Sequence, residues 1–290
     1  MKISDFRIPT SKFLFRQYKT LHRIVFPPKC LACDCFFHPP DGDTAVVAAD
    51  VGCKEYPASL SLQSQLDRLL SVCLCQACIR GLAAVESPIC DCCGIPFKSR
   101  QGLDHRCGDC TTKPKSFRIA RAPLIYEQIL TRVIHCFKYK GKVQLANPLA
   151  ELLLTAFKLF WEPDSIDIVL PVPLHSKRFR MRGFNQAYLL VRNWQMLAGQ
   201  NLYRLADLQI ERNLLVRAVA TAPQSALGRA ERTVNIKNAF DLNDPHKVKD
   251  KRILLIDDVY TTGATVNECA RLLLNCGARY VDVLTLARAV

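Results

Sequence analysis

The sequence contains no apolar run of the roughly 18 residues that a membrane-spanning helix requires. The best candidate, residues 145–161, is interrupted at Asn147, Pro148, Glu151 and Lys158. The first residues are basic and lack both the apolar core and the small-residue cleavage site of a secretory signal. We therefore expect a cytoplasmic protein with no membrane span, whose basic N-terminal segment forms a helix that packs on its own domain.

Acidic residues are scarce relative to basic ones. The 290 residues include 40 Lys and Arg but only 26 Asp and Glu, which gives a formal net charge of +14 and a pI near 9.2. Such a surplus of positive charge favours polyanionic partners, namely nucleic acid or phosphorylated substrates. An ordinary basic protein has the same property, so charge alone makes single-stranded nucleic acid a candidate partner and no more.

Cysteine is abundant, with 15 residues, and it is concentrated near the N-terminus. Four C-x2-C pairs occur within the first 110 residues: Cys30 and Cys33, Cys75 and Cys78, Cys90 and Cys93, and Cys107 and Cys110. This spacing lets two thiolates converge on one tetrahedral zinc from a tight turn. A disulfide framework is disfavoured because no secretory signal precedes the pairs. These eight cysteines therefore predict two closed, structural zinc sites.

The ligand assignment leaves alternatives open. Cys35, Cys73 and Cys92 flank the four pairs and could each replace a neighbouring thiolate, and the sequence does not tell which pairs share a metal. The gap of 41 residues between Cys33 and Cys75 is long for a zinc ribbon and indicates an insertion at about 36–72. The remaining cysteines that we single out, Cys53, Cys136, Cys269 and Cys276, are expected to be core thiols.

After Pro114 the cysteine density falls and strands alternate with helices. The hydrophobic pattern predicts helices over residues 129–137, 144–161 and 185–197, and extended segments or strands over 118–126, 166–170, 252–257 and 280–287. Alternation of this kind predicts an α/β fold, with helices on both faces of a parallel sheet.

The segment ILLIDDVYTTGAT, residues 253–265, carries the strongest functional signal. A buried strand ends in two carboxylates, Asp257 and Asp258, and a short hydroxyl-rich loop then leads into a helix. Amide groups at a helix N-terminus can hold a phosphate. The carboxylates can accept hydrogen bonds from ribose hydroxyls or face a hydrated Mg²⁺. The segment therefore predicts a site for a sugar phosphate.

A basic segment follows the preceding strand, in PVPLHSKRFRMRGFNQA at residues 171–187. Its side chains Lys177, Arg178, Arg180 and Arg182 could form an ordinary solvated face. Because the segment follows a strand of the same predicted sheet, we interpret it instead as a clamp for pyrophosphate, since arginine offers bidentate recognition of phosphate oxygens. We add Pro173 and His175 to the binding residues by their position beside this clamp.

Three further segments are more ambiguous. A polar segment from Arg217 to Asn235 could form a mobile hood over the site or an ordinary surface loop. The basic turn FKYKGK, residues 137–142, is weak by itself. Aromatic side chains near the cysteines could stack on bases, although core positions are the more frequent explanation for Phe36, Phe37, Phe97 and Phe117.

The acidic segment resembles the phosphoribosyl pyrophosphate (PRPP) binding motif of type I phosphoribosyltransferases. The resemblance implies that Asp257 and Asp258 contact the ribose hydroxyls. It also implies that the loop holds the 5′-phosphate through Thr261, Thr262, Gly263, Ala264 and Thr265. In a transfer reaction, Asp257, Asp258, Arg178 and Arg182 would stabilise the charges that develop as pyrophosphate leaves.

Across the whole chain the motifs resemble the ComF/GntX family. They occur in one order as FPPKCLAC, LCQAC, CDCCGIPF, CGDC, FKYKGK, PVPLHSKRFRMRGFNQA, the polar segment, the PRPP motif and LARAV. The resemblance implies a double zinc ribbon at 29–114 after a basic helical segment at 1–28, and a phosphoribosyltransferase-like domain at 115–290. The long gap before Cys75 departs from the family pattern at the first zinc site.

The resemblance also implies a function. We expect a PRPP-binding protein, with Mg²⁺, that acts in DNA uptake by handling incoming single-stranded DNA alongside proteins of the uptake machinery. The alternative is an active transferase that moves ribose 5-phosphate from PRPP to a nucleobase or amine. No residue of the sequence identifies an acceptor, and His175 is a candidate base by position only.

Overall fold

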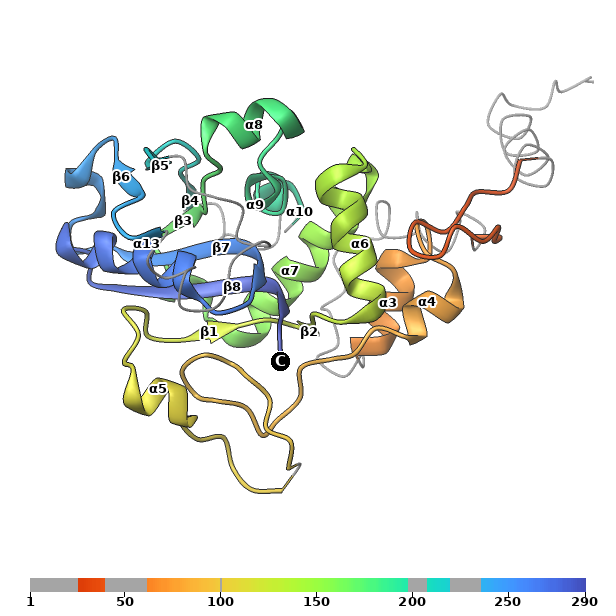
Figure 1. Cartoon of the computed structure of the whole chain (residues 1–290), viewed down its shortest axis with the longest axis horizontal. Helices are drawn as coiled ribbons and strands as arrows, with labels where there is room; N and C mark the ends of the chain where they lie inside the picture. The colour runs from red at the N-terminus through yellow and green to blue at the C-terminus, as the bar shows by residue number, and fades with distance from the viewer. Residues whose placement is uncertain (1–25, 40–61, 100, 198–207, 220–235) are drawn as a thin grey trace, which may run out of the picture.

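The computed structural model describes residues 26–39, 62–99, 101–197, 208–219 and 236–290. Its centre is a parallel sheet in the order β1-β8-β7-β3-β4, in which β2 also pairs with β8 (Figure 1). The strands are β1 (Ala120–Arg121), β2 (Leu124–Ile125), β3 (Ile168–Pro171), β4 (Gln209–Ile210), β7 (Arg252–Tyr260) and β8 (Tyr280–Arg288). The predicted α/β fold with a parallel sheet is confirmed.

Helices cover both faces of this sheet, as β7 illustrates. Leu254 and Ile256 join the core that contains α6 (Gln128–Tyr139) and α7 (Ala146–Phe160). The alternate residues Ile253 and Leu255 join a second core with α13 (Ala264–Asn275). Because neighbouring side chains of a strand point to opposite faces, an uninterrupted apolar run is what a doubly covered strand requires.

The helix predicted over residues 185–197 is wrong in detail. The structure has α8 (Ser176–Arg182), α9 (Gln186–Leu189) and α10 (Trp194–Leu197), with turns between the last two. Residues 190–193 form turns between α9 and α10 and do not continue the helix. The chain tightens there instead, and the Val191 and Trp194 amides each donate to a carbonyl three residues earlier, at 3.1 and 2.9 Å.

Smaller elements complete the C-terminal part. An antiparallel pair consists of β5 (Leu215–Arg217) and β6 (Phe240–Leu242), and single 3-10 turns are η1 (Val143–Leu145), η2 (Pro163–Ser165) and η4 (Pro245–Val248). Most of the predicted hood, residues 220–235, lies outside the described residues, as do the N-terminal segment 1–25 and Cys53. Within the described ranges, no helix is both long and apolar enough to cross a membrane.

The N-terminal part packs directly on the sheet and its helices. It contributes α3 (Leu62–Leu70), α4 (Gln76–Arg80) and α5 (Gly108–Thr112). Figure 1 places α3 and α4 beside α6, whereas α5 lies near β1. Arg68 of α3 donates to Glu151 of α7 at 2.7 Å, and the buried side chains of α3 belong to the α6–α7 core. The end of the predicted insertion is therefore a packed helix.

Candidate functional site

The acidic pair lies at the carboxyl end of the central strand. Asp257 and Asp258 come near the end of β7, between β3 and β8. Pro171 of β3 pairs with Ile256, and the Val172 amide donates to the Ile256 carbonyl at 2.8 Å. This register brings the basic segment that follows β3 directly beside the acids, at the edge where ligands of parallel sheets bind.

A cavity of about 1280 Å³ lies at this edge. Its lining includes all but one of the candidate residues of the acidic and basic segments: Pro173, His175, Lys177, Arg178, Arg182, Asp257, Asp258, Thr261, Thr262, Gly263, Ala264 and Thr265. The exception is Arg180, an exposed residue of α8 that is not part of the lining. Two segments separated in the sequence therefore face one space.

The loop after the acids turns on a glycine with a left-handed backbone. Gly263 has φ of 76° and is the residue before α13. A Cβ atom there would lie 2.1 Å from the hydroxyl oxygen of Tyr260, so any side chain would collide with this buried ring. The Ala264 amide donates to the Thr262 hydroxyl oxygen at 3.4 Å. The loop and the first turn of α13 thus present backbone donors suited to an anion.

The two acids have different surroundings. The Asp258 carboxylate forms an ion pair with the Lys138 ammonium at 2.8 Å. The Asp257 carboxylate instead accepts a hydrogen bond from the Asp258 backbone amide at 2.8 Å. Burial, together with the charge of Asp258, raises the pKa of Asp257 to about 7. Burial lowers the pKa of Lys138, but the attraction of Asp258 outweighs it, so the net pKa is raised. Asp257 therefore changes charge near neutral pH beside a lysine that stays charged.

The opposite wall carries cations from α8. Lys177, Arg178 and Arg182 project from this helix toward the cavity, and Arg182 donates to the Tyr139 hydroxyl at 2.8 Å. Burial and the nearby Arg182 lower the pKa of Arg178. Nδ1 of His175 accepts the Lys177 amide at 3.2 Å and so caps the start of α8. This contact gives His175 a structural role in addition to its position in the cavity.

Some lining residues had little or no signal in the sequence. Lys138 belongs to FKYKGK, which looked weak because its partner Asp258 is distant in the sequence. Tyr139 and Tyr126 also line the cavity, and Arg217 reaches it from β5, where its charge lowers the pKa of Asp257. The available signal for Lys138 was the run of basic residues at the C-terminal end of the amphipathic helix α6.

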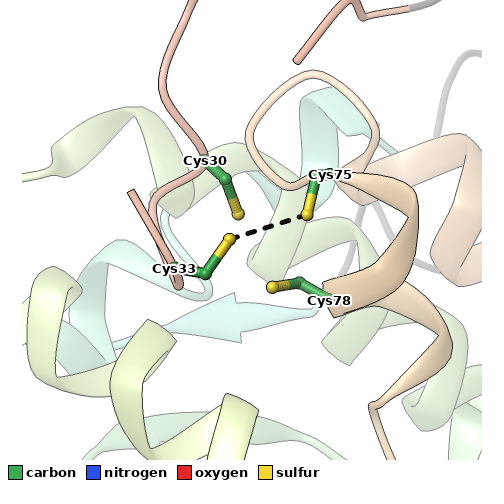
Figure 2. A group of neighbouring side chains, drawn as sticks. All are labelled: Cys30, Cys33, Cys75 and Cys78. Atoms are coloured by element: carbon green, nitrogen blue, oxygen red, sulfur yellow. Dashed lines mark hydrogen bonds between the residues drawn. The ribbon is translucent and has the colours of Figure 1, made fainter. Parts of the chain in front are cut away.

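The first cysteine cluster joins two distant C-x2-C pairs. Figure 2 shows the side chains of Cys30, Cys33, Cys75 and Cys78 turned toward one another. Their sulfur atoms all lie within 4.8 Å of one another. The Cys33 and Cys75 sulfurs lie 3.7 Å apart. A tetrahedron with Zn–S bonds of about 2.3 Å has sulfur–sulfur edges of about 3.8 Å. The cluster therefore fits a zinc ion, and it packs on the core of α6 and α7.

The second cluster joins the other two pairs in the same way. Cys90, Cys93, Cys107 and Cys110 have sulfurs within 4.8 Å of one another, with 3.8 Å between Cys93 and Cys107. The cluster belongs to the core on the α13 face of the sheet. The structure thus decides the pairing that the sequence left open, and it attaches each cluster to a different face.

The alternative ligands lie close by but outside both groups. Cys35 is exposed, with its sulfur 3.1 Å from that of Cys33, while Cys73 and Cys92 are buried in the two cores. Of the expected core thiols that the structure describes, Cys136 and Cys269 are buried and Cys276 is partly exposed. Among the aromatics, Phe117 is buried, whereas Phe36 is 64% exposed.

The sequence of this chain is similar to those of known proteins that share one family. The phosphoribosyl transferase domain family matches residues 200–289. "DNA utilization protein YhgH" of Escherichia coli O157:H7 is 34% identical over 220 residues, which cover 75% of this chain and 91% of that protein. "Competence protein F" of Haemophilus influenzae is 31% identical, covering 74% and 90%. "Competence protein ComFC" of Bacillus subtilis is 29% identical, covering 74% and 84%.

The share of each chain that is aligned supports the family assignment as much as the sequence identity does. The match to the Escherichia coli protein covers three quarters of this chain and nearly all of that protein, so the similarity is not confined to the acidic motif. The parallel sheet and the two four-cysteine clusters agree with it. The chain therefore belongs to the ComF/GntX family, with a C-terminal phosphoribosyltransferase-type domain and N-terminal cysteine clusters that could form zinc ribbons.

Proposed function

We propose that the cavity binds PRPP together with Mg²⁺, and that the protein uses this site while handling single-stranded DNA during DNA uptake. One observation carries the first part. The acidic pair with its glycine loop and the cations of α8 face a single cavity, although they come from different strand ends. A ligand complementary to this cavity carries sugar hydroxyls for the two acids and a phosphate for the glycine loop. It also carries further phosphate oxygens for the cations of α8.

The ribose and its 5′-phosphate belong to the β7 side. Asp257 and Asp258 accept hydrogen bonds from the ribose hydroxyls, and the amides around Gly263 hold the 5′-phosphate. Because the loop follows the acids directly, the distance between the two contacts is set by a few residues of backbone. This arrangement favours a ligand that carries a hydroxyl-bearing sugar next to a phosphate.

The pyrophosphate belongs to the α8 side. Lys177, Arg178 and Arg182 line this wall, and the two guanidinium groups can each offer two parallel donors to phosphate oxygens. Mg²⁺ supplies charge neutralisation to the pyrophosphate when bound, and carboxylate oxygens such as those of Asp257 are the hard ligands that it prefers. The chain's own part is to orient the sugar and to compensate the negative charge.

The DNA part of the proposal rests on the relatives and on charge. Proteins with the printed names DNA utilization protein and competence protein share most of their length with this chain. A net charge of +14 favours a polyanion, and the exposed Phe36 ring lies 5.1 Å from the Lys29 ammonium, a pairing suited to base stacking. Reduced cysteine clusters fit a cytoplasmic location, and DNA-uptake proteins are the partners we expect.

Calorimetric titration with PRPP and Mg²⁺ tests the ligand assignment. The double variant Asp257→Asn with Asp258→Asn should lose detectable binding while keeping its unfolding transition. Glu127→Gln is the matched control, because this exposed carboxylate does not line the cavity. Unchanged affinity in the double variant contradicts the ribose assignment.

Salt dependence tests the nucleic-acid assignment. The affinity for a short single strand should fall steeply with salt concentration, with a logarithmic slope of about −0.7 for each phosphate contacted. A flat response contradicts electrostatic binding of the strand. PRPP should be added in a parallel series to learn whether the two ligands compete.

The second candidate function is transfer of ribose 5-phosphate to a nucleobase or amine. The arrangement that favours it is the same: acids beside the sugar and cations at the leaving group are what displacement of pyrophosphate requires. Exchange of labelled pyrophosphate into PRPP, measured with a panel of bases, distinguishes the two. Turnover with one base supports a transferase, whereas PRPP binding without turnover supports a binding module.

A further inference from the structure

Arg288 connects the second cysteine cluster to the phosphate loop. It is the last residue of β8, its side chain is buried, and its guanidinium lies 4.3 Å from the centre of the Tyr260 ring. Burying a guanidinium is costly unless its donors find acceptors. Apart from the carbonyl of the next residue, Ala289, the acceptors that Arg288 finds belong to two different sites.

On one side the acceptors belong to the cluster. Nε of Arg288 donates to the Cys93 carbonyl at 3.1 Å, and Nη2 donates to the Cys93 sulfur at 3.7 Å. Four thiolates around one Zn²⁺ carry a formal charge of about −2, by the charges of the ligands and the ion. A buried guanidinium against one of these sulfurs offsets part of that charge. The contact is therefore strongest when the cluster holds its metal.

On the other side the acceptors belong to the start of the loop. Nη1 of Arg288 donates to the Thr261 carbonyl at 2.9 Å and to the Tyr260 carbonyl at 3.3 Å. The Tyr260 ring in turn lies against the backbone of Gly263, so that a Cβ atom there would collide with it. One planar group thus fixes the backbone at the first loop residue and the ring on which the glycine turn rests.

We propose that Arg288 is a positioning residue that transmits the metal state of the second cysteine cluster to the phosphate loop. Zinc binding at Cys90, Cys93, Cys107 and Cys110 then sets the shape of residues 261–265. The consequence for ligand affinity rests on the PRPP-binding function proposed above, but the coupling between cluster and loop does not.

The second cluster and the phosphate loop are coupled because Arg288 loses its acceptors on Cys93 when the metal is absent. Without metal the four thiols have no common centre, and the turn that presents the Cys93 carbonyl and sulfur opens. The guanidinium then loses its partners on the cluster side and no longer holds the Tyr260 and Thr261 carbonyls in one position. The loop amides lose their common orientation, and an anion finds fewer donors at once.

Hydrogen exchange in the full chain tests the coupling without any ligand. Cys107→Ala removes one thiolate of the second cluster without touching Arg288, and it should accelerate amide exchange in residues 261–265 by about tenfold or more. Cys33→Ala is the matched control, because it removes one thiolate of the first cluster on the other core. This control should leave exchange in the loop unchanged, and each variant should lose one zinc by elemental analysis.

Arg288→Lys keeps the positive charge but cannot reach both sides with a planar fork. It should retain both zinc ions and still accelerate exchange in residues 261–265, while exchange in the strand residues 253–256 stays slow. This variant also decides the matter if Cys107→Ala does not fold. Unchanged loop exchange in Arg288→Lys, or equal acceleration in Cys33→Ala and Cys107→Ala, overturns the proposal.

Titration with PRPP and Mg²⁺ separates this inference from the proposed function. If the wild-type protein binds PRPP, Arg288→Lys should weaken the affinity about tenfold, which is the effect of about 1.4 kcal/mol. If the wild-type protein does not bind PRPP, the proposed function fails, and the exchange experiment still decides whether Arg288 couples the two sites.

Discussion

The ammonium nitrogen of Lys138 lies 2.8 Å from Oδ1 of Asp258, so one acid of the PRPP-like motif has a counter-ion from a different part of the chain. The other acid, Asp257, is held by the backbone amide of Asp258 and has a pKa raised to about 7 by burial and by the charge of Asp258. The two adjacent carboxylates therefore differ in their surroundings, since Asp258 faces a lysine and Asp257 has a raised pKa.

Replacing the lysine should move the pH dependence of ligand binding. The charge of Lys138 lowers the pKa of Asp257 in the wild-type protein. In Lys138→Met the PRPP affinity should therefore rise with pH around a midpoint about 1 pH unit higher, because Asp257 ionises later. Lys138→Arg, which keeps the charge, should stay near the wild-type midpoint. Identical midpoints in Lys138→Met and the wild type contradict the prediction.

The ionisation of Asp257 should affect affinity and stability in opposite directions. A carboxyl with a pKa of about 7 in the folded protein and near 4 in the unfolded chain binds a proton on folding. Its stabilising contribution is complete below about pH 4 and is lost as the pH rises through about 7, on the order of a few kcal/mol. PRPP affinity should rise over the same upper range, because the ionised acid accepts the hydroxyl hydrogen bonds.

Asp257→Asn is the control for both trends. Denaturant unfolding across this pH range should show a smaller loss of stability in the variant than in the wild type. Calorimetry should show a weaker dependence of PRPP affinity on pH, since the ligand's own phosphate ionisation is common to both proteins. Parallel pH profiles for variant and wild type rule out Asp257 as the titrating group.

The turn at Gly263 should tolerate no side chain. Gly263→Ala must adopt a left-handed backbone at a cost of about 1–2 kcal/mol, and its Cβ must also displace the Tyr260 ring. Gly183→Ala is the matched control, because Gly183 has a similar φ of 78° and open space around its Cβ position. We expect a larger loss of stability and of PRPP affinity at Gly263 than at Gly183, measured by denaturant unfolding and calorimetry. Equal losses would show that backbone strain alone matters.

The arginines of α8 should differ in their effect on PRPP affinity according to whether they line the cavity. Arg178→Ala and Arg182→Ala should each weaken PRPP binding by about 10-fold to 100-fold, the effect of losing a hydrogen bond to a charged group. Arg180→Ala should change the affinity less than about 2-fold, because Arg180 is exposed and does not line the cavity, while its loss lowers the net charge equally. Three equal effects would point to general electrostatics rather than to a clamp.

Zinc content should distinguish the ligands of the first cluster. Wild-type protein purified under reducing conditions should contain about two zinc ions per chain. Cys33→Ala should lose one of them, whereas Cys35→Ala should retain both, because the sulfur of Cys35 lies outside the group of four. Loss of zinc from Cys35→Ala would make Cys35 a ligand. Chelation of the wild type should lower the unfolding temperature, since both clusters pack on the main cores.

Local sequence patterns predicted much of this architecture. The apolar run before Asp257 predicted a buried parallel strand, and the periodic segments that became α6 and α7 were predicted within a few residues. The helix predicted over 185–197 is wrong because the chain makes turns at residues 190–193, closed by hydrogen bonds to carbonyls three residues earlier that a hydrophobic period does not reveal. Propensity describes a segment by itself, whereas packing decides where it must bend.

By itself the sequence determined the types of chemistry: thiolates in C-x2-C spacing, an acidic pair before a glycine loop, and a run of cations after a strand. Only the tertiary structure decided which of these meet. Strand register places Val172 beside Ile256 and so brings the cations to the acids, and the packing of α6 brings Lys138 to Asp258. The C-x2-C pairs divide between two faces of one sheet, and Arg288 joins one of them to the phosphate loop. Spacing along the chain determines which ligand a single turn or loop can bind, because the residues involved are neighbours in the sequence. Contacts between distant residues depend instead on how the sheet and the helices pack.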